Sequence, residues 1–344
     1  MTSRLVIGGY TTTPDGACTG GLAMASMGPQ GLGTPVVVAE AADPSFVITS
    51  PDRRTVYAVL ERDEGLVAAW RVGGHQWEPL GSQPTGGASP CHLALSPDGR
   101  HLVASNYASG SLAVHPVGPG GALGPRSDLV QHEGSGPVAG RQDGPHAHEA
   151  VFTPSGHVVS CDLGADAVIS YRLDPDTGRL SEVSRLRLAP GTGPRHIAYA
   201  PDGSSAWVVS ELASTVVVCA VDGPSLTFVR AMSARAPGAT GENLTAEVLG
   251  SADGRRVYIS NRGDDTLTRF DVTGAGRSLG YAGAVACGGH WPRFLGWGPG
   301  QRTLVVTNER SSTITTFDVD AGDGALAQRG VFSWQRPTCF ALLD

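Results

Sequence analysis

Apolar and polar positions follow one pattern that recurs along the chain at intervals of 46 to 57 residues. Each copy has a short apolar stretch, a turn of the type Pro-Asp-Gly, and an apolar run that ends in a polar residue. The turn prolines or their equivalents are Pro51, Pro97, Pro154, Pro201, Ala252 and Pro299. Proline and glycine in these turn positions favour a tight reversal, so each copy predicts two antiparallel strands of one hairpin.

A third apolar segment follows each hairpin, at residues 110–116, 166–173, 214–219, 265–272 and 312–319. The last two alternate between Thr and apolar residues, which is typical of a strand with one wetter face. A turn rich in Gly and Asp and a weaker outer segment come next. Each repeat therefore predicts a four-stranded antiparallel sheet.

One repeat is divided between the two ends of the chain. Pro337–Leu343 matches the stretch before a turn, and Asp344 falls where the next turn proline would stand. Arg4–Tyr10 matches His101–Tyr107, which follows such a turn. Joining these halves closes a ring of seven sheets without free sheet edges. We therefore predict an all-β, seven-bladed β-propeller, with residues 1–344 as a single domain and the terminal blade completed by both ends.

Composition agrees with this fold and narrows the range of partners. The 48 glycines and 24 prolines among 344 residues suit many short strands and tight turns. A net charge of −7 argues against nucleic-acid and anionic-membrane partners, since both need a basic face. The first residues read as a strand and not a signal peptide, and no apolar run is long enough for a membrane span. The six cysteines show no CxxC spacing and are expected to be reduced and buried, so we predict a soluble cytoplasmic protein.

The chain contains no lysine, because all 25 basic residues are arginine. Schiff-base chemistry is therefore excluded, and any anion held by side chains must be held by Arg or His.

Two positions of the repeat lie on the face of the ring opposite the hairpin turns. The position six residues before the turn proline is occupied by Ser45, Cys91, His148, Arg195, Ala246, Arg293 and Thr338. The position ten residues after it is occupied by Tyr10, Glu61, Tyr107, Gly164, Glu211, Arg262 and Glu309. Both belong to strand ends near the axis, so we expect a rim with one His, three Arg and three Glu.

The charged residues concentrate on consecutive repeats, where His148, Arg195, Glu211, Arg262 and Arg293 follow one another. Glu247 stands one place beyond Ala246 and is a further candidate. Two long connections, at about 131–145 and 233–245, are expected on the same face. A site lined by guanidinium groups and covered by two loops is suited to binding a small anion. A His and a Glu beside that site can transfer a proton to or from the bound molecule.

Structural alternatives remain open for several of these residues. Arg195, Glu211, Arg262 and Glu309 can equally pair with one another across neighbouring blades. His146 and His148 form an HxH pair of the kind zinc sites use, but the rim offers no further ligand cluster. His92 and His196 are expected to face the sheet interior. We expect no metal and no cofactor.

Several segments carry a family resemblance: Gly144-Pro-His-Ala-His-Glu, Gly193-Pro-Arg-His-Ile-Ala-Tyr-Ala-Pro-Asp-Gly, Val208-Val-Ser-Glu-Leu, Tyr258-Ile-Ser-Asn-Arg-Gly and Pro292-Arg-Phe. By their order and spacing the chain resembles the lactonase family of seven-bladed propellers. That family contains propeller-type 6-phosphogluconolactonases and carboxymuconate-lactonising enzymes. Ser210 stands where the family usually has Asn.

The resemblance implies a site composed of His148, Arg195, Glu211 and Arg262, and it adds Glu247 and Arg293, the latter as an anion contact. We also count His146 among the expected substrate contacts. The resemblance implies hydrolysis of a sugar lactone, foremost 6-phosphogluconolactone, with His148 or alternatively Glu211 as the base for water. A carboxymuconate-type cycloisomerase is the alternative chemistry. A non-catalytic binding propeller is the second alternative, because Val305-Val-Thr-Asn resembles repeats of surface proteins.

Overall fold

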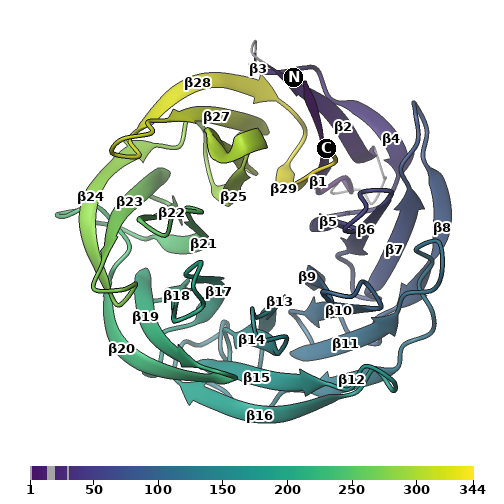
Figure 1. The fold of residues 1–344 in the computed structure, drawn as a ribbon, viewed down its shortest axis with the longest axis horizontal. Coiled ribbons are helices and arrows are strands. Elements are labelled where there is room, and N and C mark those ends of the chain that lie inside the picture. Colours follow the sequence, from purple (N-terminus) through teal and green to yellow (C-terminus); the bar gives the residue numbers. More distant parts are fainter. Residues whose placement is uncertain (1, 14–19, 29–30) are drawn as a thin grey trace.

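The computed structural model describes residues 2–13, 20–28 and 31–344. Within them the chain forms seven antiparallel sheets arranged as a ring around a central axis (Figure 1). The prediction of an all-β, seven-bladed propeller is confirmed. Cys18 lies outside the described residues, and the other five cysteines are free and buried, as expected.

Six blades are formed by consecutive strands, the innermost strand coming first. Blade 1 consists of β5 (Val47–Thr49), β6 (Thr55–Leu60), β7 (Leu66–Arg71) and β8 (Glu78–Pro84). Blade 2 consists of β9 (Pro90–Leu95), β10 (His101–Asn106), β11 (Ser111–Pro116) and β12 (Asp128–Gln131). Blade 3 consists of β13 (Ala147–Phe152), β14 (Val158–Asp162), β15 (Ala167–Leu173) and β16 (Leu180–Arg187).

Blade 4 consists of β17 (Pro194–Tyr199), β18 (Ser205–Ser210), β19 (Thr215–Asp222) and β20 (Ser225–Ser233). Blade 5 consists of β21 (Leu244–Gly250), β22 (Arg256–Arg262), β23 (Thr266–Thr273) and β24 (Ser278–Ala286). Blade 6 consists of β25 (Pro292–Trp297), the 3-10 turn η1 (Pro299–Gln301), β26 (Thr303–Asn308), β27 (Thr313–Val319) and β28 (Leu326–Ser333).

Blade 7 joins the two ends of the chain, as the divided repeat predicts. It consists of β29 (Pro337–Leu342), β1 (Ser3–Gly9), β2 (Gly21–Gly28), β3 (Gly31–Leu32) and β4 (Val36–Glu40). Strand β29 is innermost and pairs antiparallel with β1, with Leu5 opposite Leu342 and Ile7 opposite Phe340. The ladder hydrogen bonds between the chain ends therefore close the ring.

The turn chemistry explains the recurring hairpins. In blade 2 the Asp98 carboxylate accepts hydrogen bonds from the Ser96 hydroxyl and the Arg100 amide, at 2.6 and 3.1 Å. Gly99 adopts φ 72°, a left-handed conformation that glycine reaches without a Cβ clash. The second strands that follow these turns are almost entirely buried, whereas the outer strands are largely exposed. The apolar core thus lies between the blades, in the middle strands.

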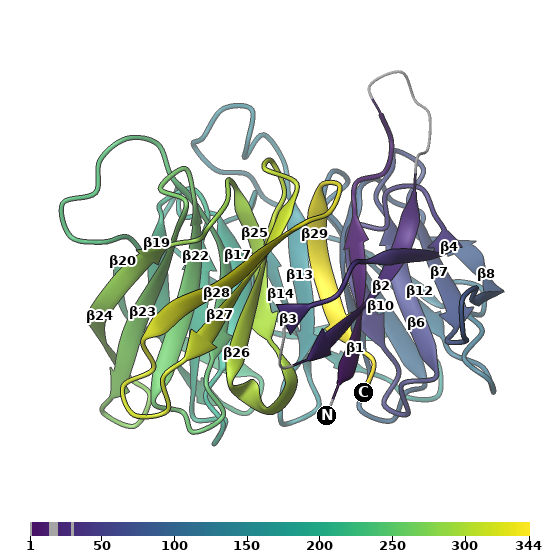
Figure 2. The ribbon, with the colours of Figure 1, turned by 90° about the horizontal axis from the view of Figure 1, so that it is seen from above.

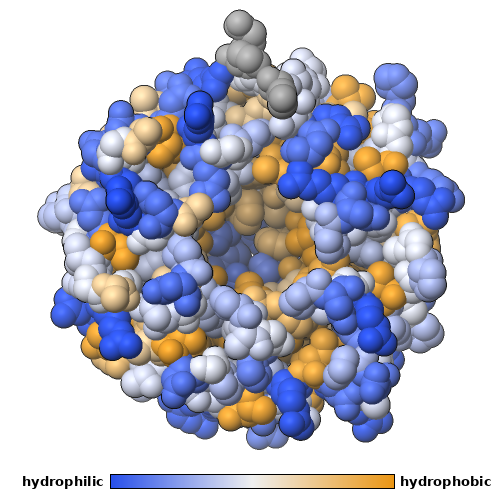
Figure 3. Space-filling model, viewed as in Figure 1, coloured by the Kyte–Doolittle hydropathy of each residue, from blue (hydrophilic) through white to orange (hydrophobic). Residues whose placement is uncertain are grey.

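The two faces of the ring differ. Figure 2 shows the β12–β13 and β20–β21 connections projecting from the face opposite the two termini. The face seen in Figure 3 is hollowed at its centre, with apolar residues around the hollow. No helix among the described residues is long and apolar enough to cross a membrane.

Candidate active site

A β-bulge at the start of the inner strands turns side chains toward the axis. In blade 3, Ala147 pairs with Asp162 and Glu149 with Cys161, so His148 between them has no partner residue across the ladder. The same irregularity leaves out Cys91, Arg195, Arg293 and Thr338 in their blades. Bulges commonly redirect side chains beside active sites. This backbone irregularity explains why the position six residues before the turn supplies the rim.

A cavity of about 190 Å³ lies where these strand ends meet. It is lined by Tyr10, Glu61, Cys91, Tyr107, Arg141, His148, Glu211, Arg262 and Arg293. Eight of the nine belong to the two rim positions that the repeat predicts, and together they come from all seven blades. The cavity therefore lies on the axis of the ring. We call it the axial cavity.

Glu211 is the centre of an arginine cluster on one side of the axial cavity. Its carboxylate lies 2.6 Å from an Arg262 nitrogen and 3.2 Å from Arg195 Nε, and it also pairs with Arg141. Burial alone would raise the pKa of Glu211, but these three guanidinium groups outweigh it and hold the pKa well below its usual range. Glu211 therefore stays ionised and serves poorly as a general base.

A second ion-pair group lies across the axial cavity. The Arg293 guanidinium is 3.4 Å from Glu309 and 3.7 Å from Glu61, and it lies 5.3 Å from the centre of the Tyr10 ring. The Tyr10 hydroxyl donates to Glu61 at 2.9 Å. Arg293 is thus fixed at the cavity wall by two carboxylates and one aromatic ring.

His148 is the imidazole that reaches the axial cavity. Its side chain is 6% exposed, and its Nδ1 lies 4.0 Å from the Cys91 sulfur. Burial, together with the positive charges of Arg195, Arg293 and Arg262, lowers the pKa of His148 well below its usual value. The ring is therefore neutral near pH 7 and able to accept a proton.

Below His148 lies a second group of buried titratable side chains, which we call the buried tier. It consists of His92, Glu149, His196 and Glu247, one from each of four consecutive inner strands. The His196 ring lies 5.3 Å from the His92 ring and 5.2 Å from the His148 ring, and its Nδ1 is 2.9 Å from the Glu247 carboxylate. His92 and His196 are thus buried, as expected, but face the axis and not the sheet interior, because the bulges redirect them.

The charge state of the buried tier differs from that of the axial cavity. Burial raises the pKa of Glu247 to about 8. Burial, reinforced by Glu247, raises the pKa of Glu149 well above its usual range. Both carboxyls are therefore protonated near neutral pH or below it, between neutral histidines.

Three members of the buried tier carry possible metal-ligand atoms. Atoms of His92, Glu149 and His196 lie within 4.8 Å of one another. The same site faces the positive charges of Arg195, Arg262 and Arg293, which lower the pKa of His196 in addition to the effect of burial. That field opposes a cation, so the residues fit a neutral hydrogen-bonded group better than a metal centre.

The predicted site residues fall into two groups, those that line the axial cavity and those that lie behind its wall. His148, Glu211, Arg262 and Arg293 line the axial cavity. Arg195 lies behind Glu211 and donates to the Ala246 carbonyl at 2.6 Å. Burial and Arg262 lower its pKa to about 10, so it stays charged.

Glu247 and His146 are also absent from the cavity wall. Glu247 belongs to the buried tier. The His146 ring stacks on Tyr107 at 4.5 Å, and its Nδ1 lies 2.9 Å from the Tyr107 carbonyl oxygen. His146 thus supports Tyr107, and Glu247 supports His196, from outside the cavity wall.

Arg141 is the cavity residue that the repeat does not contain. It belongs to the connection between β12 and β13, where the buried Gln142 donates to the Leu163 carbonyl at 2.8 Å. That bond fixes the loop, so that the Arg141 guanidinium forms an ion pair with the Glu211 carboxylate. The only sequence signal was the predicted position of this long connection beside the site.

A larger groove of about 840 Å³ adjoins the axial cavity. Arg141 and Arg262 line both. The two long connections form its walls, with Val138 from one and Asn243 from the other. We call it the loop groove.

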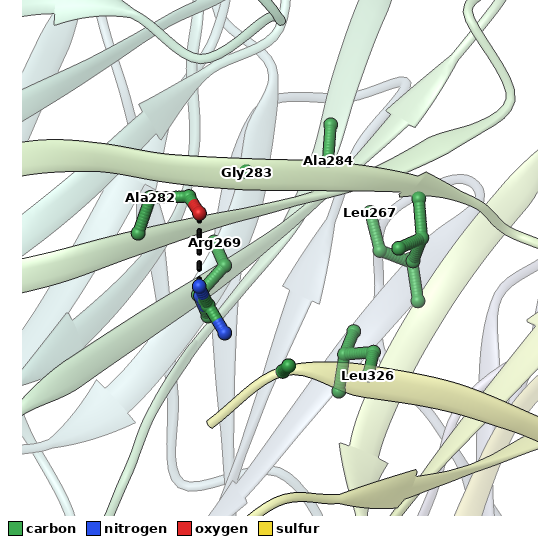
Figure 4. A pocket seen from close by; sticks show the side chains of 8 residues that line it. Leu267, Arg269, Ala282, Gly283, Ala284 and Leu326 are labelled. Carbon is green, nitrogen blue, oxygen red and sulfur yellow. Dashed lines mark hydrogen bonds between the residues drawn. The ribbon is translucent and has the colours of Figure 1, made fainter. Parts of the chain in front are cut away.

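Another pocket, of about 210 Å³, lies on the outer wall between blades 5 and 6 (Figure 4). Leu267, Ala284 and Leu326 line it, and Arg269 donates to the Ala282 carbonyl at 2.8 Å. The single charged group that lines it is already bonded to the backbone, so this pocket offers no catalytic set.

The sequence and the structure match known proteins over nearly the whole chain. The family model described as "Lactonase, 7-bladed beta-propeller" matches residues 4–342. A 6-phosphogluconolactonase of Bacillus subtilis is 33% identical over 301 residues, covering 86% of this chain and 85% of that protein. The solved structure of a periplasmic gluconolactonase of Pseudomonas aeruginosa superposes with a TM-score of 0.92 at 29% identity, covering 100% and 99% of the two chains.

A putative 6-phosphogluconolactonase of Bacteroides fragilis has a TM-score of 0.91 at 29% identity, covering 100% and 98% of the two chains. These matches agree with the resemblance inferred from the sequence motifs. The chain belongs to the lactonase family of seven-bladed β-propellers.

Proposed function

We propose that this protein hydrolyses a sugar lactone at the axial cavity, with 6-phosphogluconolactone as the first candidate substrate. One observation carries the proposal: a neutral imidazole, His148, shares a cavity of about 190 Å³ with the guanidinium groups of Arg262 and Arg293. Lactonases among its relatives support the reaction class.

Opening a lactone needs a proton acceptor for the attacking water and a stabiliser for the oxyanion. His148 takes the proton from water as the water oxygen attacks the carbonyl carbon. The ring C–O bond then breaks, and the imidazolium returns the proton to the leaving alkoxide, which gives a hydroxy acid. Because burial and the arginines keep the pKa of His148 low, its conjugate acid releases the proton readily.

The arginines stabilise the negative charge that this reaction develops. Arg262 and Arg293 come from the neighbouring blades 5 and 6, and each is fixed at the cavity wall by carboxylates. Three Arg and two Glu line the cavity, so its wall carries one positive charge in excess. This excess suits the carboxylate of the product and a singly charged transition state.

The same charge count bears on the carboxymuconate-type alternative. A polycarboxylate needs several cations at once, whereas Arg141 and Arg262 already pair with Glu211, and Arg293 pairs with Glu309. The ion pairs therefore weigh against a polycarboxylate whose charges all enter the axial cavity, whereas the reacting ring of a lactone is neutral.

Ring opening of freshly prepared 6-phosphogluconolactone at slightly acidic pH tests the proposal, since spontaneous opening is slow there. We expect acceleration by the wild type, a loss of about 10²–10⁴-fold in His148→Ala, and full activity in His75→Ala, whose side chain is exposed between β7 and β8. Glucono-δ-lactone in a parallel assay shows whether the phosphate contributes. If the folded wild type accelerates neither lactone, the proposal is wrong, and binding without turnover would indicate a non-catalytic propeller.

A further inference from the structure

The axial cavity is small for a complete substrate site. Small-molecule sites commonly measure about 300–1,000 Å³. The axial cavity, at about 190 Å³, is below that range, whereas the loop groove, at about 840 Å³, is within it. Since Arg141 and Arg262 line both, a molecule whose reactive group enters the cavity extends naturally into the groove.

Several polar side chains of the loop groove are already engaged in internal hydrogen bonds. The Arg235 guanidinium binds both Asp264 carboxylate oxygens at 2.7 and 2.6 Å, and also the carbonyls of Thr240 and Gly241. Asn243 donates to Ser214 and Asn261, at 3.0 and 3.1 Å. These bonds hold the loop in shape and leave those groups little capacity for a sugar hydroxyl or a phosphate.

The rest of the lining is mixed: Glu242, Thr215 and Ser233 are polar, and a separate group is apolar or aromatic. Val138, Leu212, Ala213 and Leu244 form that group together with Trp291. Ala213 is exposed, and its small side chain leaves the groove open.

Trp291 is held in a strained backbone conformation at the junction of groove and cavity. Its φ of 68° is left-handed, which costs a non-glycine residue roughly 1–3 kcal/mol. Its amide donates to Asp265 at 2.8 Å, and its ring receives the guanidinium groups of Arg310 and Arg262, at 3.3 and 5.4 Å from the ring centre. The same left-handed conformation recurs at the equivalent position of other blades, at Asp43, Ser89, Gly193 and Arg336, so it belongs to the turn that enters the inner strand.

We propose that the loop groove is a subsite for an apolar or aromatic substituent of the lactone, so that the protein accepts aryl- or alkyl-substituted lactones in addition to small sugar lactones. This inference rests on lactone opening at the axial cavity. The ring enters the axial cavity, and the substituent lies between Val138 and Leu244, past Arg141.

The test compares δ-valerolactone with 5-phenyl-δ-valerolactone. An apolar group in a fitting pocket contributes about tenfold or more to specificity, so we expect wild-type kcat/KM to be at least tenfold higher for the phenyl compound. Ala213→Trp fills the groove from an exposed position and is expected to abolish that preference while keeping δ-valerolactone turnover within twofold. Val138→Asp, at another position of the groove lining, is expected to act in the same direction. Ala252→Trp, exposed on the turn face, is the matched control and should change neither rate.

Equal rates for both lactones, or equal losses for both in Ala213→Trp, would overturn the inference. If the wild type opens neither lactone, the hydrolytic proposal fails for these compounds, and calorimetry with the two ring-opened hydroxy acids still tests the groove. Binding of 5-hydroxy-5-phenylpentanoate at least tenfold tighter than 5-hydroxypentanoate, lost in Ala213→Trp, supports the subsite. Equal binding of the two acids refutes it.

Discussion

Glu211 and Glu247 are buried glutamates of neighbouring blades, near the same axis, yet their protonation states are opposite. Glu211 lies among three guanidinium groups, which outweigh its burial and keep it ionised. Glu247 bonds a neutral His196, and burial raises its pKa to about 8. The difference teaches that the partners of a buried carboxyl, more than its depth, decide its charge.

The two regions therefore have different parts in the proposed chemistry. The axial cavity keeps its charges and is suited to an anionic transition state. The side chains of the buried tier below it are uncharged. The tier contacts His148 through His196, whose ring centre lies 5.2 Å from the centre of the His148 ring.

The largest effect is expected from Glu211→Gln. Removing the carboxylate leaves Arg141, Arg195 and Arg262 facing one another without their common partner, and breaking a buried ion pair in this way costs about 3–5 kcal/mol. Urea unfolding at pH 7 measures the loss of stability, and lactone opening should fall with it. A stability within 1 kcal/mol of wild type would show that Glu211 does not organise the arginines.

His148→Ala is expected to reduce kcat by about 10²–10⁴-fold with little change in fold, since it removes the proposed proton acceptor. His146→Ala removes a ring stacked on Tyr107 outside the cavity wall and should retain most activity. Steady-state kinetics on both variants decide between the two histidines. Loss of activity in His146→Ala alone would assign the proton transfer to His146.

Glu247→Gln should change the pH dependence of stability. The pKa of Glu247 is raised on folding, so its stabilising contribution is complete below its unfolded pKa and is lost as pH rises toward about 8. Wild-type stability should fall across that range by at most about 1.4 kcal/mol per pH unit. Because the amide does not titrate, Glu247→Gln should lack this component of the slope. Parallel slopes in urea unfolding from pH 5 to 8 would mean that Glu247 is ionised throughout.

The smallest effect is expected from Cys91→Ala. Cys91 lines the axial cavity beside His148, but burial raises the pKa of its thiol far above neutrality, so it cannot act as a nucleophile. Lactone kinetics should stay within about threefold of wild type, and iodoacetamide should not inactivate the protein through this residue. Abolished turnover would point to a covalent thioester route.

The sequence predicted the ring and most of the cavity because both follow from the repeat. The divided repeat specified the pairing of β29 with β1, and the two rim positions contained His148, Glu211, Arg262 and Arg293. Arg141 was missed because its loop lies outside the repeat. Arg195, Glu247 and His146 do not line the axial cavity, and the spacing could not show this because the bulges and partner groups that orient these side chains leave no mark in it.

The most direct test measures 6-phosphogluconolactone opening by Glu211→Gln and Glu247→Gln side by side at pH 6. At that pH Glu247 is protonated and its amide replacement is nearly isosteric, so we predict activity within about threefold of wild type for Glu247→Gln. Glu211→Gln disrupts the arginines that we propose stabilise the oxyanion, and we predict a loss of about 10²–10³-fold. Equal activities of the two variants would contradict the account that a charged axial cavity opens the lactone above a neutral buried tier.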